Sequence, residues 1–475
     1  MAAPSVRAGS GRAVKTLLIV ARCPSPKQTY SEYPLGVGMI GTALRRRGHE
    51  AAVFDQAAEN ADDRSVRAFV RRYAPEAVGF SVVTPNYPTT QRLMRWVRAD
   101  CPGALILAGG VHATLFPEDL LDDGADAVVL GEGVRTTVAL LQSGRDRRRW
   151  RDLPGLVFRS RDGRTVRTPA AIPAAADDVD DIDREVYNLP LYTHHSMLAS
   201  LGCPYRCTFC CNYSGMVLNR RPRSRPYGRI IQEMRVLADR HRADRVFFAD
   251  DVFLLRRSDV LAFCRELAAQ ALGVRWIAQM RADAIDPEVA EHLAAAGCRR
   301  VYLGVESGSE AILRRVRKGI DKESIRLAVR SAAGAGIRVK TGWIFGLPGT
   351  PQEQAETIPF LRELRPDEVS IHYLVPFPGT DYYRHPGKHG IRIRDPRDFR
   401  SFSYGGLSDN FVFDYVSHAQ LAGLVEQAVE ALESDGYTSS DRATAADRYV
   451  FSTPFCASPI RVFPAQEEGL PCPSA

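Results

Sequence analysis

At 475 residues, with 45% hydrophobic and 25% charged residues, the chain has the composition of a globular protein of about two or three domains. No apolar run approaches the ~20 residues that a membrane span needs, and residues 1–15 lack the apolar segment of a secretory signal. We therefore expect a cytoplasmic protein with no membrane partner and with a disordered N-terminus at residues 1–13. The net charge of +7 is mild, and the basic stretch 218–226 lacks interleaved aromatic residues, so we expect no nucleic-acid partner.

Residues 14–145 alternate short apolar runs with amphipathic stretches. We predict strands at 16–21, 50–55, 77–82, 104–110 and 127–133, and helices at 36–48, 63–73 and 89–100. This alternation predicts an α/β fold with a doubly wound, Rossmann-like parallel sheet whose ligands bind beyond the carboxyl ends of the strands. The loop after the first strand has no GxGxxG pattern, which disfavours a dinucleotide.

Residues 146–195 break this pattern, because a β-hairpin turning at Asp162-Gly163 is followed by a Pro/Ala/Asp-rich linker. A second alternating run occupies residues 196–400. Its six strands are predicted at 196–201, 245–250, 274–280, 300–306, 337–345 and 368–375. Six β/α units indicate a partial, TIM-like (β/α)6 barrel with its chemistry at the carboxyl ends of the strands. Residues 401–475 are predicted to be a small C-terminal extension with one amphipathic helix.

Four of the ten cysteines fall within GCPYRCTFCCN, residues 202–212, directly after the first barrel strand. Thiolates at Cys203, Cys207 and Cys210 can face one [4Fe–4S] cube and leave its fourth iron open to another ligand. Structural zinc favours a closed set of four ligands, normally in two separated pairs. Cys211 directly follows Cys210, and adjacent residues do not easily point at one metal. We predict an open-site cluster, with zinc or inert packing as the alternatives.

This loop resembles the signature of the radical SAM superfamily, and later segments resemble that family's S-adenosylmethionine (SAM) contacts in the expected order. The resemblance implies that Phe209 packs near the adenine, that Asp250 or Asp251 binds the amino group, and that Arg281 holds the carboxylate. It further implies ribose contact by Glu306. The remaining implied contacts come from two strand ends and are Gly346, Pro348, Gly349 and Val375. Taken singly, these residues also fit a surface carboxylate, a salt bridge or an ordinary turn.

A doubly wound domain ahead of such a barrel resembles the cobalamin-binding (B12-dependent) radical SAM family, which includes the class B methyltransferases. The resemblance implies that cobalamin lies over the strand ends of the first domain. The implied contacts are Pro34, Leu35, Ser81, Thr84, Gly109, Gly110, His112, Gly131, Glu132 and Gly133. The Asp-x-His-x-x-Gly signature of an axial histidine is absent. We therefore expect His112 to make an edge contact or a structural turn rather than to bind cobalt.

The resemblance implies a cobalamin-dependent radical SAM C-methyltransferase that acts on an unactivated carbon of a small molecule in natural-product biosynthesis. Its cofactors would be a [4Fe–4S] cluster, SAM and cobalamin, and its electron donor an external protein of the flavodoxin or ferredoxin type. Two alternatives are a B12-dependent radical enzyme that catalyses a cyclisation, rearrangement or oxidation, and a non-enzymatic cobalamin sensor. The sequence does not encode the substrate.

Overall fold

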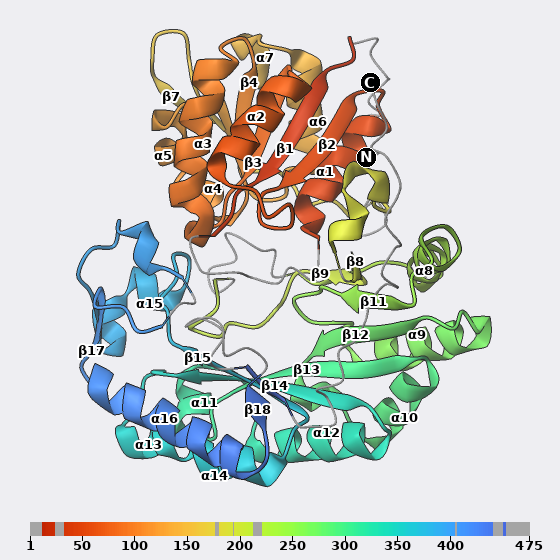
Figure 1. Ribbon diagram of the computed structural model, residues 1–475, viewed down its shortest axis with the longest axis vertical. Coiled ribbons are helices and arrows are strands. Elements are labelled where there is room, and N and C mark those ends of the chain that lie inside the picture. The colour runs from red at the N-terminus through yellow and green to blue at the C-terminus, as the bar shows by residue number, and fades with distance from the viewer. Residues whose placement is uncertain are drawn as a thin grey trace.

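The computed structural model describes residues 12–23, 33–175, 180–192, 194–211, 221–403, 406–439 and 450–452. Two α/β units lie one above the other (Figure 1). Residues 1–11, most of the segment predicted to be disordered, lie outside the described residues. Among the helices of the described ranges, none is long and apolar enough to cross a membrane.

The first unit is a doubly wound sheet of strand order β2-β1-β3-β4-β5-β6-β7, which confirms the predicted α/β class. Its parallel strands are β1 (Lys15–Val20), β2 (Glu50–Asp55), β3 (Ala77–Ser81), β4 (Leu105–Gly109) and β5 (Ala127–Val129). Its helices are α1 (Leu35–Arg45), α2 (Asp63–Tyr73), α3 (Tyr87–Asp100), α4 (Val111–Leu115), α5 (Pro117–Asp122), α6 (Val134–Ser143) and α7 (Arg147–Trp150), with the 3₁₀ turn η1 (Thr84–Asn86) before α3. Helix α6 was not predicted, and the strand expected at 127–133 ends at Val129 instead. Gly131 then adopts a left-handed φ of 66°, which stops the strand.

The predicted hairpin is confirmed as β6 (Leu156–Arg159) and β7 (Thr165–Arg167), which turn through Gly163 at a φ of 82°. It is not part of a connector, however, because β6 pairs antiparallel with β5 and extends the first sheet. The first sheet therefore runs past residue 145, where we expected the domain to end.

The second unit contains six adjacent parallel strands, so the predicted partial barrel is confirmed. These strands are β8 (His195–Met197), β11 (Arg245–Phe248), β12 (Arg275–Met280), β13 (Cys298–Glu306), β14 (Arg338–Phe345) and β15 (Glu368–Tyr373). The main helices are α8 (Tyr227–His241), α9 (Arg257–Gln270), α10 (Pro287–Ala295), α11 (Glu310–Arg315), α12 (Lys322–Gly334), α13 (Pro351–Ala355) and α14 (Thr357–Leu364). Burial alternates along β13, where Val301, Leu303 and Val305 are buried. Figure 1 shows most of these helices along one face of the sheet, with the first unit beyond the other face.

The C-terminal part of the chain completes this sheet. Helix α16 (His418–Ser434) packs near α14, and β18 (Thr438–Ser439) and β19 (Val450–Ser452) add antiparallel strands beside β15. Before them lie α15 (Asp381–Arg384), the 3₁₀ turns η7 (Pro386–His389) and η8 (Phe399–Ser401), and a ribbon of β16 (Ile391–Ile393) and β17 (Phe411–Phe413). The short ribbon of β9 (Ser200–Leu201) and β10 (Arg223–Ser224) flanks the cysteine loop.

Candidate cofactor site between the two sheets

The cysteine loop follows β9 and is fastened to the barrel through Thr208. The Thr208 amide donates to the carbonyl of Val316 (3.0 Å), and its hydroxyl donates to the hydroxyl of Tyr382 (2.8 Å). Within the loop, the amide of Cys210 donates to the carbonyl of Cys207 (3.1 Å). Cys207 is buried, whereas Cys203 and Cys210 are partly exposed. The backbone therefore holds the three predicted ligands in one short turn at the carboxyl rim of the barrel.

The donor set of this loop fits an iron–sulfur cube. Burial raises the pKa of Cys207 to about 11, while Lys318 acts in the opposite direction and the nearby Cys210 raises it further. In the described ranges, no three His, Cys, Asp or Glu side chains converge as ligands of a single metal ion. Each cysteine of a cube binds a different iron, so the three thiols need not converge on one point.

Arg281 braces the cysteine loop. Its guanidinium carbon lies 3.6 Å from the centre of the Tyr205 ring, in a cation–π contact. Its remaining donors reach both carboxylate oxygens of Asp283 (2.9 Å each) and the carbonyls of Lys318 (3.0 Å) and Gly319 (3.1 Å). The carboxylate contact predicted for Arg281 would have to replace one of these bonds.

The two candidate aspartates have different surroundings. Asp250 is 1% exposed and accepts from the amides of Ala199 and Ser200 and from the Ser200 hydroxyl, so it fixes the start of β9. Burial raises its pKa to about 7. Asp251 instead accepts from the amide of Gly202 and lies within electrostatic reach of Cys203. Asp251 is therefore the better placed of the two for a ligand on the cysteine loop.

Glu306 ends β13 in a backbone conformation that is rare for a residue with a side chain, with a φ of 71°. Its carboxylate pairs with Nζ of Lys318 at 2.7 Å. A Cβ on Gly304 would lie 2.5 Å from Oε1 of Glu306, so glycine at 304 makes room for this pair. Backbone strain of this kind concentrates at functional sites. Lys318 also lies 5.9 Å from the Phe209 ring. The sequence did not predict Lys318 as a site residue, and its place after an arginine-rich helix was the only signal that could have indicated this role.

The glycine segment after β14 is packed against its neighbours. Gly346 has a φ of 93°, and its carbonyl accepts from the Tyr415 hydroxyl at 2.8 Å. The Pro348 carbonyl accepts from Arg315 at 2.6 Å. A Cβ on Gly349 would lie 2.7 Å from Ile312, and Val375 is 6% exposed. These glycines therefore serve close packing at the rim, and their contact with SAM stays a prediction.

At the facing edge of the first sheet, several of the predicted cobalamin residues lie together. Ser81 ends β3 beside Gly109, and Thr84 follows in η1. A Cβ on Gly110, which has a φ of 102°, would lie 2.8 Å from the carbonyl of Val82, so only glycine fits there. Because β1 lies between β2 and β3, this edge includes the switch point of the sheet, where doubly wound folds bind ligands.

His112 is fully buried at this edge and enclosed by aromatic rings. Its ring centre lies 4.3 Å from that of Tyr87, 4.7 Å from Phe399 and 5.0 Å from Phe116. Nδ1 lies 3.2 Å from the Thr84 hydroxyl, and Nε2 finds no hydrogen-bond partner among the residues described. Burial, with a contribution from Arg397, lowers its pKa to about 3. An imidazole enclosed by three aromatic rings agrees with the expected structural turn better than with cobalt ligation.

The other predicted cobalamin residues lie where the sheet edge meets the barrel or α1. The Glu132 carboxylate is engaged by Arg223 and by the amide of Ala174. Gly131 donates to the Thr114 hydroxyl (2.9 Å), and Gly133 caps α6. The Pro34 carbonyl accepts from the Tyr187 hydroxyl (2.6 Å) just before Leu35 begins α1.

The doubly wound domain, the partial barrel and the three-cysteine loop together define a radical SAM protein with a cobalamin-type domain. Comparison with known families agrees with both halves. The B12 binding domain family matches residues 27–141, and the Radical SAM superfamily matches residues 197–361. The chain therefore contains a B12-binding domain followed by a domain of the radical SAM superfamily.

Similar proteins extend over both domains. An uncharacterized methyltransferase of Pyrococcus horikoshii is 26% identical over 358 residues, which are 73% of this chain and 77% of that protein. The anaerobic magnesium-protoporphyrin IX monomethyl ester cyclase of Rubrivivax gelatinosus is 26% identical over 74% of this chain and 66% of its own length. Among solved structures, the radical SAM methyltransferase TsrM of Kitasatospora setae, with cobalamin and a [4Fe–4S] cluster bound, gives a TM-score of 0.71 at 20% identity and covers 88% of this chain and 91% of its own.

Proposed function

We propose that the protein is a cobalamin-dependent radical SAM C-methyltransferase that acts on an unactivated carbon of a small molecule in natural-product biosynthesis. The observation that carries this proposal is the placement of the cysteine loop against the carboxyl edge of the B12-binding domain. Glu132 of that edge pairs with Arg223 of β10, and β10 pairs with the strand that leads into the loop. Two cofactors bound at these places would face one another.

When bound, the cluster and SAM would supply a 5′-deoxyadenosyl radical that removes a hydrogen atom, and cobalamin would supply the methyl group. The residues of the chain would bind and orient these groups. Cys203, Cys207 and Cys210 would hold the cluster, Asp251 and Glu306 would hold polar groups of SAM, and Thr208 would keep the loop in place. The aromatic rings around His112 would exclude water from that part of the edge where cobalamin would bind.

We extend the proposal to partners and location. A reductive cleavage of SAM consumes one electron, so an external donor of the flavodoxin or ferredoxin type is needed. Thiolate ligands of a reduced cluster require a reducing compartment, which is consistent with the cytoplasm. No nucleic-acid or membrane partner is part of the proposal.

The similarity to the Rubrivivax cyclase supports a second candidate function, namely a B12-dependent radical cyclisation or oxidation. The products distinguish the two. Methylation leaves S-adenosylhomocysteine together with 5′-deoxyadenosine, whereas a radical cyclisation or oxidation leaves 5′-deoxyadenosine alone.

The test is anaerobic reconstitution with iron, sulfide and hydroxocobalamin, followed by absorption spectra and product analysis under reduction with SAM. We expect Cys207→Ala to lose the cluster absorption and all SAM cleavage, while it retains cobalamin. Cys211→Ala is the matched control, because it alters the neighbouring cysteine that we do not expect to bind iron. Tightly bound zinc in the wild type, or SAM cleavage by Cys207→Ala, would contradict the proposal.

A further inference from the structure

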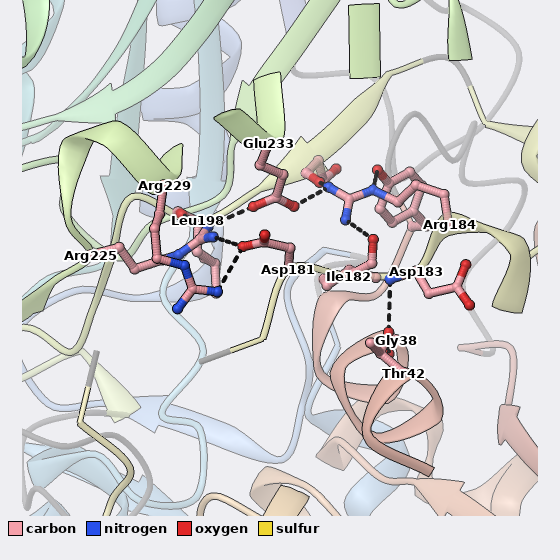
Figure 2. A network of polar contacts seen from close by, with 12 residues as sticks. Gly38, Thr42, Asp181, Ile182, Asp183, Arg184, Leu198, Arg225, Arg229 and Glu233 are labelled. Atoms are coloured by element: carbon pink, nitrogen blue, oxygen red, sulfur yellow. Dashed lines mark hydrogen bonds and ion pairs between the residues drawn. The ribbon is translucent and has the colours of Figure 1, made fainter. Parts of the chain in front are cut away.

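A buried ionic cluster joins the two domains on the side of α1 (Figure 2). At its centre, Glu233 of α8 places Oε1 2.7 Å from Nη2 of Arg184 and Oε2 2.7 Å from Nη1 of Arg225. Glu233, Arg184 and Arg225 are 4%, 2% and 3% exposed, so water does not screen their charges. Burial opposes the ionisation of Glu233, but the two arginines outweigh it and hold its pKa below the usual range.

On one side, the ionic cluster binds the B12-binding domain through hydrogen bonds. Nε of Arg184 donates to the Tyr33 hydroxyl, just before α1, at 2.6 Å. The amide of Asp183 donates to the Thr42 hydroxyl at 2.9 Å, and that hydroxyl donates to the Gly38 carbonyl within α1 at 2.7 Å. The segment 181–184 is thus fastened to α1 by both a side chain and its own backbone.

On the other side, the ionic cluster binds the strands that lead to the cysteine loop. Arg184 donates to the Ser196 carbonyl in β8 at 2.9 Å. Arg225 donates to the Leu198 carbonyl at 2.6 Å and to Asp181 at 2.6 Å. Leu198 lies between β8 and β9, and β9 runs directly into the loop that carries Cys203.

A bridge made of charges is specific in a way that an apolar contact is not. Buried ion pairs add little net stability compared with apolar residues of the same volume, because desolvation opposes the attraction. The hydrogen bonds that Arg184 and Arg225 donate to the Tyr33 hydroxyl and to the carbonyls of Ser196 and Leu198, however, have fixed directions and lengths, so they define one arrangement of the groups that they join. Here those groups are α1 of the B12-binding domain and the strands before the cysteine loop.

We infer that Glu233, with Arg184 and Arg225, is a positioning residue that sets the distance between cobalamin and the SAM held at the cysteine loop. The inference rests on the proposed function. None of the three residues belongs to the set predicted to touch a cofactor. Their effect would be exerted through the placement of one domain on the other.

The experiment loosens the bridge without leaving a buried charge unpaired. Tyr33→Phe with Thr42→Val removes the hydroxyl that accepts from Arg184 and the hydroxyl that accepts from the Asp183 amide, and it keeps Glu233, Arg184 and Arg225. The matched control is Tyr73→Phe with Thr90→Val, in the same domain. Thr90 is as buried as Thr42 and makes the same hydrogen bond one helical turn back, but its hydroxyl accepts nothing from the segment 181–184. Glu233→Gln is a third variant that keeps the shape of the side chain.

Each variant is reconstituted, reduced with titanium(III) citrate and given SAM without further substrate. When reduced cobalamin takes the methyl cation of SAM, S-adenosylhomocysteine is released and no electron is consumed. When the cluster donates one electron to SAM, the bond between C5′ and sulfur breaks and methionine leaves. The 5′-deoxyadenosyl radical then abstracts a hydrogen atom from buffer or protein and becomes 5′-deoxyadenosine. Formation of S-adenosylhomocysteine needs the two domains to be correctly placed relative to one another, whereas formation of 5′-deoxyadenosine needs the barrel alone.

We expect the Tyr33/Thr42 variant to form S-adenosylhomocysteine about tenfold more slowly or worse, since a misplacement of ~1 Å can cost on the order of 100-fold. Its 5′-deoxyadenosine formation, cluster absorption and cobalamin content should match those of the control variant. Equal S-adenosylhomocysteine rates in both variants would overturn the inference, and so would a parallel fall of both products, which would indicate a purely structural role.

The proposed function and the positioning role can be tested separately. If the wild type releases no S-adenosylhomocysteine, the proposed methyl transfer is contradicted, but the role of Glu233, Arg184 and Arg225 in positioning the domains is not. In that case, pulsed EPR of cob(II)alamin and the reduced cluster decides. A longer or broader distance distribution in the Tyr33/Thr42 variant and in Glu233→Gln than in the control supports positioning. An unchanged distribution overturns it.

Discussion

Two of the junctions between the domains are built from different kinds of contact. On the side of α1, the contact consists of buried charges, in which Glu233 binds Arg184 and Arg225. On the side of α4, the contact consists of aromatic rings, in which His112 of the B12-binding domain meets Phe399 of η8 in an edge-to-face contact. Both junctions flank the edge where cobalamin would face the cysteine loop.

The difference shows how the same pair of domains is fixed in two ways. Charged hydrogen bonds hold direction and length, whereas ring contacts supply burial and tolerate small shifts. Even the titratable groups follow this division. His112 remains neutral among rings, while Glu233 remains ionised between arginines. The ionic junction should therefore respond to the loss of one partner, and the aromatic junction to the gain of a proton.

The largest effect is expected from Glu233→Ala, which leaves Arg184 and Arg225 buried with no carboxylate between them. Breaking a buried ion pair by removing one partner costs about 3–5 kcal/mol. Guanidinium denaturation of the apoprotein measures this loss. A triple variant with Glu233→Leu, Arg184→Met and Arg225→Met should regain most of it, because no buried charge remains. A loss below ~1 kcal/mol in the single variant would show that water reaches the cluster.

Acidification should weaken the aromatic junction. The folded-state pKa of His112 is lowered to about 3, below its unfolded value near 6.5, so the unfolded chain binds more protons between these two values. The contribution of neutral His112 is complete above the unfolded pKa and is lost as the pH falls toward the folded one. Between pH ~7 and pH ~5 this amounts to about 2 kcal/mol.

The measurement is the free energy of unfolding at several pH values for the wild type and His112→Phe, which keeps a ring but does not titrate. The variant should lose stability less steeply on acidification. An identical pH dependence in wild type and His112→Phe would mean that water reaches the ring.

A smaller contrast is expected when the same hydroxyl is removed at each junction. Tyr33→Phe leaves Nε of Arg184 without its acceptor in a site that is 2% exposed, so a loss of about 2 kcal/mol is expected. Tyr87→Phe removes the hydroxyl that donates to Asp123, but Gln91 and Arg95 still donate to that carboxylate. About 1 kcal/mol is expected there. Thermal and guanidinium unfolding of both variants compare them, and equal losses would contradict the contrast.

Much of this architecture could be predicted because it depends on local patterns. The cysteine spacing, the alternating β/α runs and the missing axial-histidine signature are all visible within short windows. The end of β5 was predicted too late, because its apolar run continues to Leu130, and only the left-handed backbone at Gly131 shows that the strand has ended.

The ionic junction could not be predicted as a junction, because its partners are 49 and 8 residues apart in sequence and come from a linker, a loop and a helix. One local signal was present. Glu233 lies on the buried stripe of α8 with Ile230, Met234 and Leu237, and a carboxylate on an apolar stripe needs a buried cation. The sequence indicated that a partner existed without indicating which of the many arginines it was.

The smallest effect is expected at the third contact between the domains, the pair of Glu132 and Arg223. The side chains of Glu132 and Arg223 are 34% and 15% exposed, so the pair is partly hydrated and its loss should cost at most about 1 kcal/mol. Because Arg223 and the Ala174 amide already engage the Glu132 carboxylate, Glu132→Gln should also leave cobalamin binding close to that of the wild type. Equilibrium binding of hydroxocobalamin, compared at low and high salt, checks both points. A large loss of cobalamin affinity would instead make Glu132 the ligand contact that the sequence resemblance implies.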